Sequence, residues 1–162
     1  QIFSMILWGP PGVGKTTLCE YFAKRHPDFF HIPEIARVFG IEKVKQERCN
    51  KLQEKMVLCQ INIENYHENF IADGSVLDFG IYSFDYDFLQ KCRCLMVDRY
   101  DFVFYIPIKF PLKNNNFRNT DVVFQKKMDK RFQIYKPLDS ITLNGWHIKD
   151  RVEEIERRIG LI

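Results

Sequence analysis

The sequence predicts an α/β fold in three layers, with a central, mostly parallel sheet flanked by helices. Short apolar runs alternate along the chain with stretches in which apolar side chains recur at helical spacing. The first run, residues 2–8, leads into Gly-Pro-Pro-Gly-Val-Gly-Lys-Thr at positions 9–16, and a helical pattern follows at once. A strand, a glycine-rich turn and a helix in this order form the opening unit of such folds.

The composition is that of a compact globular chain. Hydrophobic residues make up 46% of the 162 residues and aromatic residues 15%, and no apolar run reaches the roughly 18 residues that a membrane span requires. We expect one domain over residues 1–162, without a membrane segment and without a signal peptide, because the first segment lacks a basic start. The 5 cysteines form no C-x-x-C pair, which favours free thiols in a reducing cytoplasm.

The segment from Gly9 to Thr16 matches the phosphate-binding loop G-x-x-x-x-G-K-[ST] at every required position. Its glycines let the backbone wrap an anion, and the N-terminus of the following helix adds positive potential. We expect Lys15 to reach the β- and γ-phosphates of ATP and the Thr16 hydroxyl to ligate Mg²⁺. The other predicted nucleotide contacts are Gly9, Pro11, Gly12, Val13, Gly14 and Thr17. A chance glycine-rich turn is the alternative, and the intact strand, loop and helix argue against it, so the chain is predicted to have the P-loop NTPase fold.

Four more strands are predicted after the first, each from a short apolar run. They are residues 29–33, 70–75, 101–106 and 141–143. The run at 101–106 is expected to be a central strand, and Pro107 stops it.

Helical patterns separate these strands. The predicted helices are residues 17–24, 47–70, 77–90, 121–135 and 150–159, with a short helix or ordered loop at 34–39. Ligands of open α/β sheets sit beyond the carboxyl ends of the strands, so the polar residues that follow each strand are the candidates for function.

A carboxylate, Glu34, directly follows the second predicted strand. There it would face the γ-phosphate across the cleft and accept the proton of an attacking hydroxyl as general base. Arg37 would share its helix face, and would bind a phosphate or hold Glu34. The alternative is a helix-start glutamate with an i, i+3 arginine partner, a common surface pair.

Two acids follow the third predicted strand. Asp73 stands at the strand end, where P-loop enzymes hold Mg²⁺, usually through water, and it is the predicted metal residue together with Thr16. Asp78 is expected to have a structural role instead, as the cap or first-turn acid of the next helix.

The polar, basic segment 109–121 after the fourth strand is predicted to be a lid over the phosphates. We expect Arg118 to stabilise charge in the transition state, and Lys109 and Lys113 are weaker candidates for this role. A solvated surface loop is the alternative. The positive residues of the next helix, Lys126, Lys127, Lys130 and Arg131, are expected to form a solvated face.

These segments resemble those of small P-loop kinases that act on nucleosides and related metabolites. Residues 32–37 are similar to the Pro-Glu-Pro-x-x-Arg type segment of deoxyribonucleoside kinases, whose Glu is the general base, and residues 73–75 resemble their acid-Arg-Ser segment. The overall order also resembles the nicotinamide riboside kinase domain of the bacterial NAD-biosynthesis regulator and its phage-type AAA-like relatives. In those proteins a helix rich in Gln and Tyr precedes the strand that bears the Mg²⁺-associated Asp.

The chain departs from this pattern at two places. Gly74 stands where the acid-Arg-Ser segment has its Arg, and Asn116-Phe117 replaces the Asp-Gly that precedes the Arg of the lid. A catalytic arginine at position 74 is therefore absent, and the resemblance implies that Arg37 or Arg118 takes over its role.

The predicted function is an ATP-dependent kinase that uses Mg²⁺ and phosphorylates a nucleoside, a nucleotide or a related small metabolite. A P-loop ATPase or switch acting on a protein partner is one alternative, although no Walker-type Asp-Glu pair follows an apolar strand. A polynucleotide 5′-end kinase is another, but the net charge of +3 gives nucleic acid little support as a partner. A cytoplasmic location is expected, and a homodimer is left open.

Overall fold

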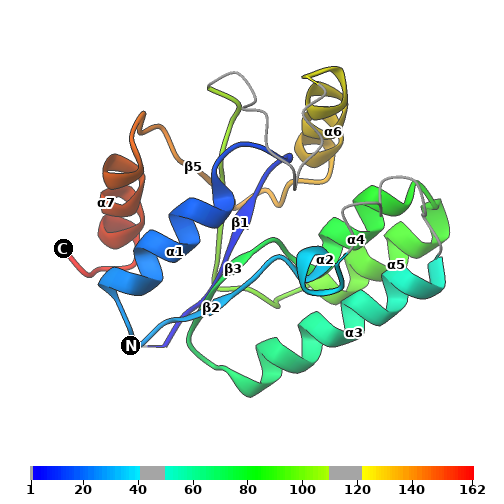
Figure 1. The fold of residues 1–162 in the computed structure, drawn as a ribbon, viewed down its shortest axis with the longest axis horizontal. Helices are drawn as coiled ribbons and strands as arrows, with labels where there is room; N and C mark the ends of the chain where they lie inside the picture. The colour runs from blue at the N-terminus through cyan, green and yellow to red at the C-terminus, as the bar shows by residue number, and fades with distance from the viewer. Residues whose placement is uncertain (1, 41–49, 110–121) are drawn as a thin grey trace.

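The computed structural model describes residues 2–40, 50–109 and 122–162, and its framework is a five-stranded parallel sheet (Figure 1). The strands are β1 (Ser4–Trp8), β2 (Phe30–Ile32), β3 (Phe70–Asp73), β4 (Phe102–Tyr105) and β5 (Ile141–Thr142). They lie in the order β2-β3-β1-β4-β5, and every pairing is parallel. The predicted sheet is confirmed, with β1 at its centre and β4 between β1 and β5.

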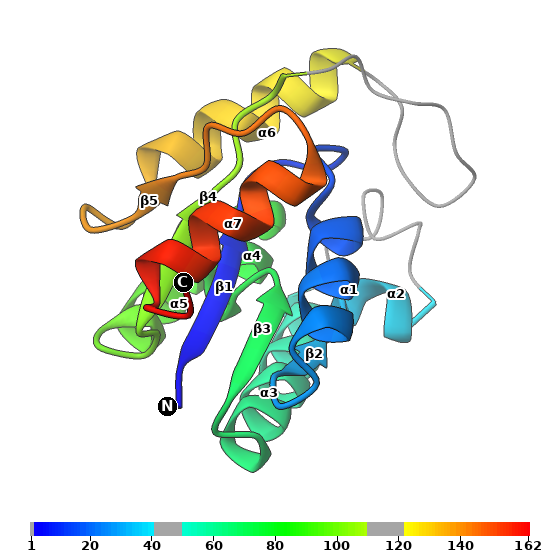
Figure 2. The same cartoon turned by 90° about the vertical axis from the view of Figure 1, so that its left-hand side faces the viewer.

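Helices cover both faces of the sheet, which gives the three predicted layers (Figure 2). The helices are α1 (Lys15–Arg25), α2 (Ile35–Val38), α3 (Asn50–Tyr66), α4 (Val76–Ser83), α5 (Tyr86–Met96), α6 (Val122–Ile134) and α7 (Ile148–Arg158). Helices α1 and α7 pack on one face, and α3, α4, α5 and α6 lie on the other. No helix in the described ranges combines the length and the apolarity needed to cross a membrane.

Alternation along β1 explains why its sequence is apolar throughout. Met5 and Leu7 belong to the core under α1 and α7, whereas Ile6 and Trp8 belong to the core on the other face. Successive strand side chains point to opposite faces, so a strand covered on both sides reads as one continuous apolar run.

The predicted helix at 77–90 is wrong, because the structure has two helices there. Helix α4 ends before Phe84, which adopts a left-handed conformation with φ 54°, and α5 begins at Tyr86 and continues beyond position 90. Asp85 caps α5 by accepting the Phe88 backbone N–H at 2.9 Å. The two helices fold against each other at Gly80, where a Cβ would lie 3.0 Å from the Leu89 Cα.

The other predicted bounds differ by a few residues. The last helix begins at Ile148 rather than Asp150, which lies in its first turn, and the second strand is shortened to Phe30–Ile32. The predicted lid at 109–121 lies outside the described residues except for Lys109. Of the cysteines, four carry free thiols in the described ranges, as predicted, and Cys49 lies outside them.

Candidate nucleotide-binding site

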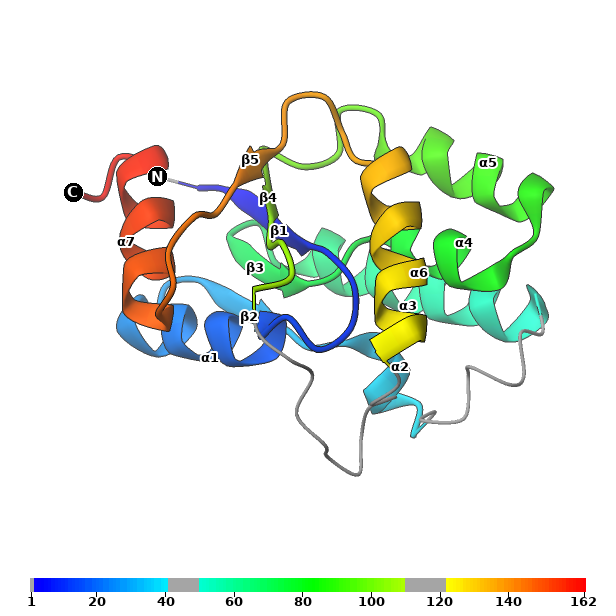
Figure 3. The ribbon, with the colours of Figure 1, turned by 90° about the horizontal axis from the view of Figure 1, so that it is seen from above.

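The phosphate loop lies at the carboxyl end of β1 and turns into α1 between the layers (Figure 3). Gly9, Gly12 and Gly14 all have positive φ angles, of 153°, 81° and 93°, which favour glycine. At Gly9 space is decisive as well, because a Cβ there would lie 2.9 Å from the Ile106 carbonyl oxygen. The motif glycines are therefore required by the backbone path.

Lys15 is the first residue of α1, and its side chain returns over the loop. Its Nζ donates to the Gly9 carbonyl at 2.7 Å and lies 5.5 Å from the centre of the Phe132 ring. The side chain is only 7% exposed. A nearly buried ammonium group inside the loop is the arrangement that favours an anionic ligand.

The two residues predicted to hold Mg²⁺ are in direct contact. The Thr16 hydroxyl donates to Asp73 Oδ2 at 2.5 Å, and parallel pairing of β1 with β3 places Leu7 opposite Asp73. Mg²⁺ prefers oxygen ligands and usually keeps several waters beside one or two carboxylates and the substrate phosphates. A hydroxyl and a nearly buried carboxylate fit this preference, although no group of three or more His, Cys, Asp or Glu gathers in the described residues.

A buried polar network holds the turn that follows Asp73. Glu64 of α3 is its centre: it accepts from Arg99 Nε at 2.6 Å, from the Tyr100 hydroxyl at 2.7 Å and from Gln60 Nε2 at 2.9 Å. Gln60 also donates to the Gly74 carbonyl at 3.1 Å, and the Tyr100 oxygen accepts the Val76 N–H at 3.1 Å. The network thus fixes the backbone on the carboxyl side of the predicted metal residue.

Asp78 takes the structural position that was predicted. It lies in the first turn of α4, where its Oδ1 accepts the Ser75 N–H at 3.0 Å and the Ser75 hydroxyl at 2.8 Å. Burial raises the pKa of Asp78 from 3.8 to about 6, while Lys15 and Ser75 oppose the rise. Gly74 has a φ of 107°, and a Cβ there would lie 2.9 Å from Asp78 Oδ2, so the backbone favours glycine over arginine at this position.

Glu34 and Arg37 form the ion pair that the structural alternative predicted. Glu34 directly precedes α2, beyond the carboxyl end of β2, and its Oε2 lies 3.2 Å from Arg37 Nε. Both side chains are partly exposed, at 44% and 34%. The position at the strand end also agrees with a role in chemistry, so the general-base assignment stays a prediction.

The basic residues after β4 are placed only in part. Arg118 and Lys113 lie outside the described ranges. Lys109 is described, and its Nζ donates to the Asn144 carbonyl and lies 5.3 Å from the centre of the Trp146 ring. Arg131, expected on a solvated face, instead donates to the Ile81 carbonyl at 3.0 Å and packs on Phe84.

Gln53 of α3 was not singled out from the sequence. It is fully buried, and both polar atoms of its amide lack a hydrogen-bond partner in the described part of the chain. Gln60, seven residues later, reaches the end of β3, and α3 runs antiparallel to β3 because only a short turn joins them. Gln53 therefore lies about 10 Å further on, beyond the carboxyl end of the strand. The available signal was a glutamine on the same helix stripe as Met56.

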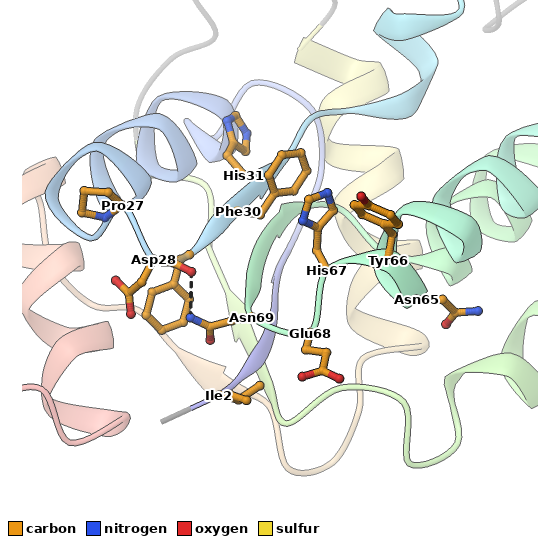
Figure 4. Close-up of a pocket in the computed structure, with 11 residues that line it drawn as sticks. Ile2, Pro27, Asp28, Phe30, His31, Asn65, Tyr66, His67, Glu68 and Asn69 are labelled. Atoms are coloured by element: carbon orange, nitrogen blue, oxygen red, sulfur yellow. Dashed lines mark hydrogen bonds between the residues drawn. The ribbon is translucent and has the colours of Figure 1, made fainter.

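A separate hollow of about 660 Å³ lies at the opposite end of the sheet (Figure 4). It is lined by residues 27–31 and 65–69 and by Ile2, all near the amino ends of the strands. Phe30 stacks on His67 there, with ring centres 3.6 Å apart, and Tyr66 borders the same hollow. Its position separates it from the phosphate loop.

The fold and the loop define a P-loop nucleotide-binding domain. The AAA domain family matches residues 4–135, and the chain belongs to this family. Replication-associated recombination protein A of Haemophilus influenzae is 30% identical over 96 residues, a match that covers 49% of this chain and 20% of that protein. The chain thus spans about a fifth of the length of this curated relative.

Solved structures of small kinases share the fold. Deoxyadenosine kinase from M. mycoides with bound dATP has a TM-score of 0.68 at 13% identity, covering 97% of this chain and 99% of that chain. Shikimate kinase from Acinetobacter baumannii in complex with shikimate has a TM-score of 0.63 at 17% identity, covering 99% and 94%. Thymidylate kinase from Candida albicans has a TM-score of 0.65 at 15% identity, covering 99% and 92%. The predicted resemblance to small P-loop kinases is confirmed at the level of the fold.

Proposed function

We propose that this protein is a phosphotransferase that moves the γ-phosphoryl group of Mg²⁺-ATP to a hydroxyl of a small, nucleoside-like molecule. The observation that carries the proposal is the contact of Thr16 with Asp73 at the base of a complete phosphate loop. The likeness in fold to deoxyadenosine, shikimate and thymidylate kinases supports the reaction class. Because those names cover different molecules, they do not select the acceptor.

The chemistry assigns a task to each residue around the loop. The acceptor oxygen attacks the γ-phosphorus, the bond from that phosphorus to the bridging oxygen of ADP breaks, and the hydroxyl proton passes to the Glu34 carboxylate. Lys15 and the loop N–H groups stabilise the charge on the transferring group, and Arg37 or Arg118 adds a further cation. Mg²⁺, held by Thr16 and Asp73, supplies additional charge neutralisation when it is bound.

Gln53 supports a nucleoside-like acceptor. A carboxamide offers a donor and an acceptor side by side, which suits a partner with the complementary pair, such as the edge of a nucleobase. Leaving both atoms buried and unpaired costs stability, and a ligand that satisfied them would recover that cost as binding free energy. We therefore assign Gln53 to the acceptor site.

The proposal is tested by offering labelled ATP with nucleosides, nucleoside monophosphates and nicotinamide riboside, and measuring product formation. Phosphate transfer to at least one of them is expected, and Lys15→Ala should abolish it.

Glu34→Gln should lower kcat by about a hundredfold while ATP binding persists, since a general base contributes about that much. Gln53→Met should raise KM for the acceptor and melt at a higher temperature, because a buried unpaired amide is removed.

Two results would contradict the proposal. ATP hydrolysis that no acceptor accelerates would favour the ATPase or switch, and transfer to oligonucleotide ends with a steep salt dependence would favour the polynucleotide kinase. Unchanged turnover of Glu34→Gln would show that Glu34 is not the general base, and it would leave the rest of the proposal standing. The cytoplasmic location and the homodimer stay predictions from the sequence.

A further inference from the structure

Three carbonyl groups of the phosphate loop, at alternating positions, each accept a hydrogen bond from a side chain. Lys15 Nζ bonds to the Gly9 carbonyl at 2.7 Å. Gln125 Nε2 bonds to the Pro11 carbonyl at 3.0 Å, and an Arg151 terminal nitrogen bonds to the Val13 carbonyl at 3.2 Å. Lys15 belongs to the motif, whereas the other two donors come from remote parts of the chain.

Gln125 and Arg151 approach the loop from opposite layers. Gln125 is on α6, whose apolar residues join the core with α3 and α4, and Arg151 is on α7, which packs with α1. The two side chains are only 2% and 4% exposed. Arg151 Nε also bonds to the Gly145 carbonyl at 3.0 Å, so this buried guanidinium joins the start of α7 to the loop. Polar groups are costly to bury, and each of these two buried side chains donates one hydrogen bond to the loop backbone.

Peptide planarity turns these bonds into a constraint on the loop donors. A trans peptide holds the carbonyl of one residue and the N–H of the next in opposite directions. Fixing the Pro11 and Val13 carbonyls therefore aims the N–H groups of Gly12 and Gly14 the other way. The two residues before Gly12, Pro10 and Pro11, have no N–H, so Gly12 is the first residue after Gly9 whose backbone can donate to an anion.

We propose that Gln125 and Arg151 are positioning residues that set the phosphate loop in its anion-binding conformation before the nucleotide arrives. A preset loop loses less conformational entropy when it binds, which raises affinity without any direct contact. Burial lowers the pKa of the Arg151 guanidinium, so the loop is also flanked by a poorly solvated cation that favours the triphosphate. This inference rests on the proposed function in one respect, namely that the loop binds a nucleotide.

The test compares Gln125→Met and Arg151→Met with matched controls on the same helices. Gln133 of α6 bonds to Asp129 rather than to the loop, and Arg157 of α7 is exposed, so Gln133→Met and Arg157→Met serve as controls. Calorimetry with Mg²⁺-ADP should give a Kd about tenfold higher for each loop variant, the usual size for one lost hydrogen bond of this kind. The controls should stay within about twofold of the parent.

Amide hydrogen exchange of the nucleotide-free protein gives a second measurement. Residues 12–14 should exchange faster in the loop variants, while β1 keeps its protection. If Arg151→Met does not fold, Arg151→Lys replaces it in the test. Lysine keeps the charge, but one ammonium group cannot bond to the Val13 and Gly145 carbonyls as the guanidinium does. An exchange rate between those of the parent and a full loss of contact is therefore expected.

The outcomes separate this inference from the proposed function. Parent protein that binds no Mg²⁺-ADP contradicts the proposed function, and the exchange comparison then decides the inference alone. Unchanged Kd and unchanged loop exchange in both Gln125→Met and Arg151→Met overturn the inference even when the kinase is active. Lower melting temperatures with neither change would assign the two side chains to packing, which also overturns it.

Discussion

Asp73 and Asp78 stand five residues apart and are both nearly buried, yet their surroundings prepare them for different roles. Asp73 bonds to the Thr16 hydroxyl beside the phosphate loop. Asp78 bonds to the backbone and side chain of Ser75, and burial raises its pKa to about 6. The first is the residue that we propose for Mg²⁺, and the second closes the first turn of α4.

The raised pKa of Asp78 makes the stability of the fold depend on pH. Folding favours the protonated form, so the stabilisation is complete below the ordinary pKa of 3.8 and is lost as pH rises toward about 6. That difference in pKa corresponds to at most about 3 kcal/mol. Asp78→Asn keeps an oxygen for both Ser75 bonds and cannot ionise. We expect it to be more stable than the parent by about 1–3 kcal/mol at pH 7, and equal to it near pH 4.

Urea unfolding of Asp78→Asn between pH 4 and 7 measures this effect. Asp87→Asn is the matched control, because Asp87 is an exposed acid in the first turn of α5. The same pH slope in the parent and in Asp78→Asn would show that Asp78 does not carry the linkage.

Single residues were predictable from the sequence where a local motif defines them. The phosphate loop names Lys15 and Thr16 by spacing alone. Gln125 and Arg151 instead bond to partners far along the chain, and the Gln53 amide is buried without a partner in the described ranges. Each of the three lies on the same face of its helix as core residues, and this spacing predicts that the polar side chain is buried. The spacing does not predict the hydrogen-bond partner of the side chain, because the partner depends on how the layers pack.

At the scale of elements, the sequence pattern predicted strands better than helix ends. Apolar runs located all five strands, since a parallel strand buried on both faces has no polar interruption. The break between α4 and α5 was missed because residues 77–90 keep an apolar stripe through it. The local signal was Ser83-Phe84-Asp85, in which the Asp is a good N-cap.

Tyr100 supports the connection from β3 to α4, and we expect this contact to affect Mg²⁺ binding at the proposed metal site. Burial and the nearby Glu64 raise the pKa of Tyr100 well above its ordinary value, so its hydroxyl stays protonated. Tyr100→Phe leaves the Val76 N–H unpaired and removes one donor from Glu64. The expected loss of stability is about 1–3 kcal/mol.

The same variant should also need more Mg²⁺, because the turn after Asp73 loses an anchor. A Mg²⁺ titration of ATP binding should show an apparent affinity for Mg²⁺ several-fold weaker than in the parent. Tyr105→Phe is the control, because the Tyr105 hydroxyl bonds to Asp129 and Gln133 and not to the turn that follows Asp73. Equal Mg²⁺ dependence in the two variants would restrict the Tyr100 network to a structural role.

For the whole molecule, the three layers were predictable because the strand signals and most of the helix signals agree on one arrangement. The contacts between helices distant in the sequence were not, since they bring together residues more than a hundred positions apart. Glu156 of α7 is an example: its Oε2 lies 3.1 Å from Arg25 Nε and 2.7 Å from His26 Nε2 at the end of α1. Charge pattern within either helix does not predict this cluster.

Glu156→Gln should separate global stability from nucleotide binding. The Glu156 side chain is only 2% exposed, whereas Arg25 and His26 are 41% and 19% exposed and can rehydrate. We therefore expect a loss of about 1–3 kcal/mol in the free energy of unfolding, below the 3–5 kcal/mol typical of a fully buried pair. The Kd for Mg²⁺-ATP should stay within about twofold, because the Arg151 contact with the loop lies at the other end of α7. Urea unfolding and calorimetry give the two values, with Glu20→Gln, an exposed position on α1, as the control. A large loss of affinity at unchanged stability would mean that the α1–α7 contact affects the phosphate loop rather than holding the two helices together.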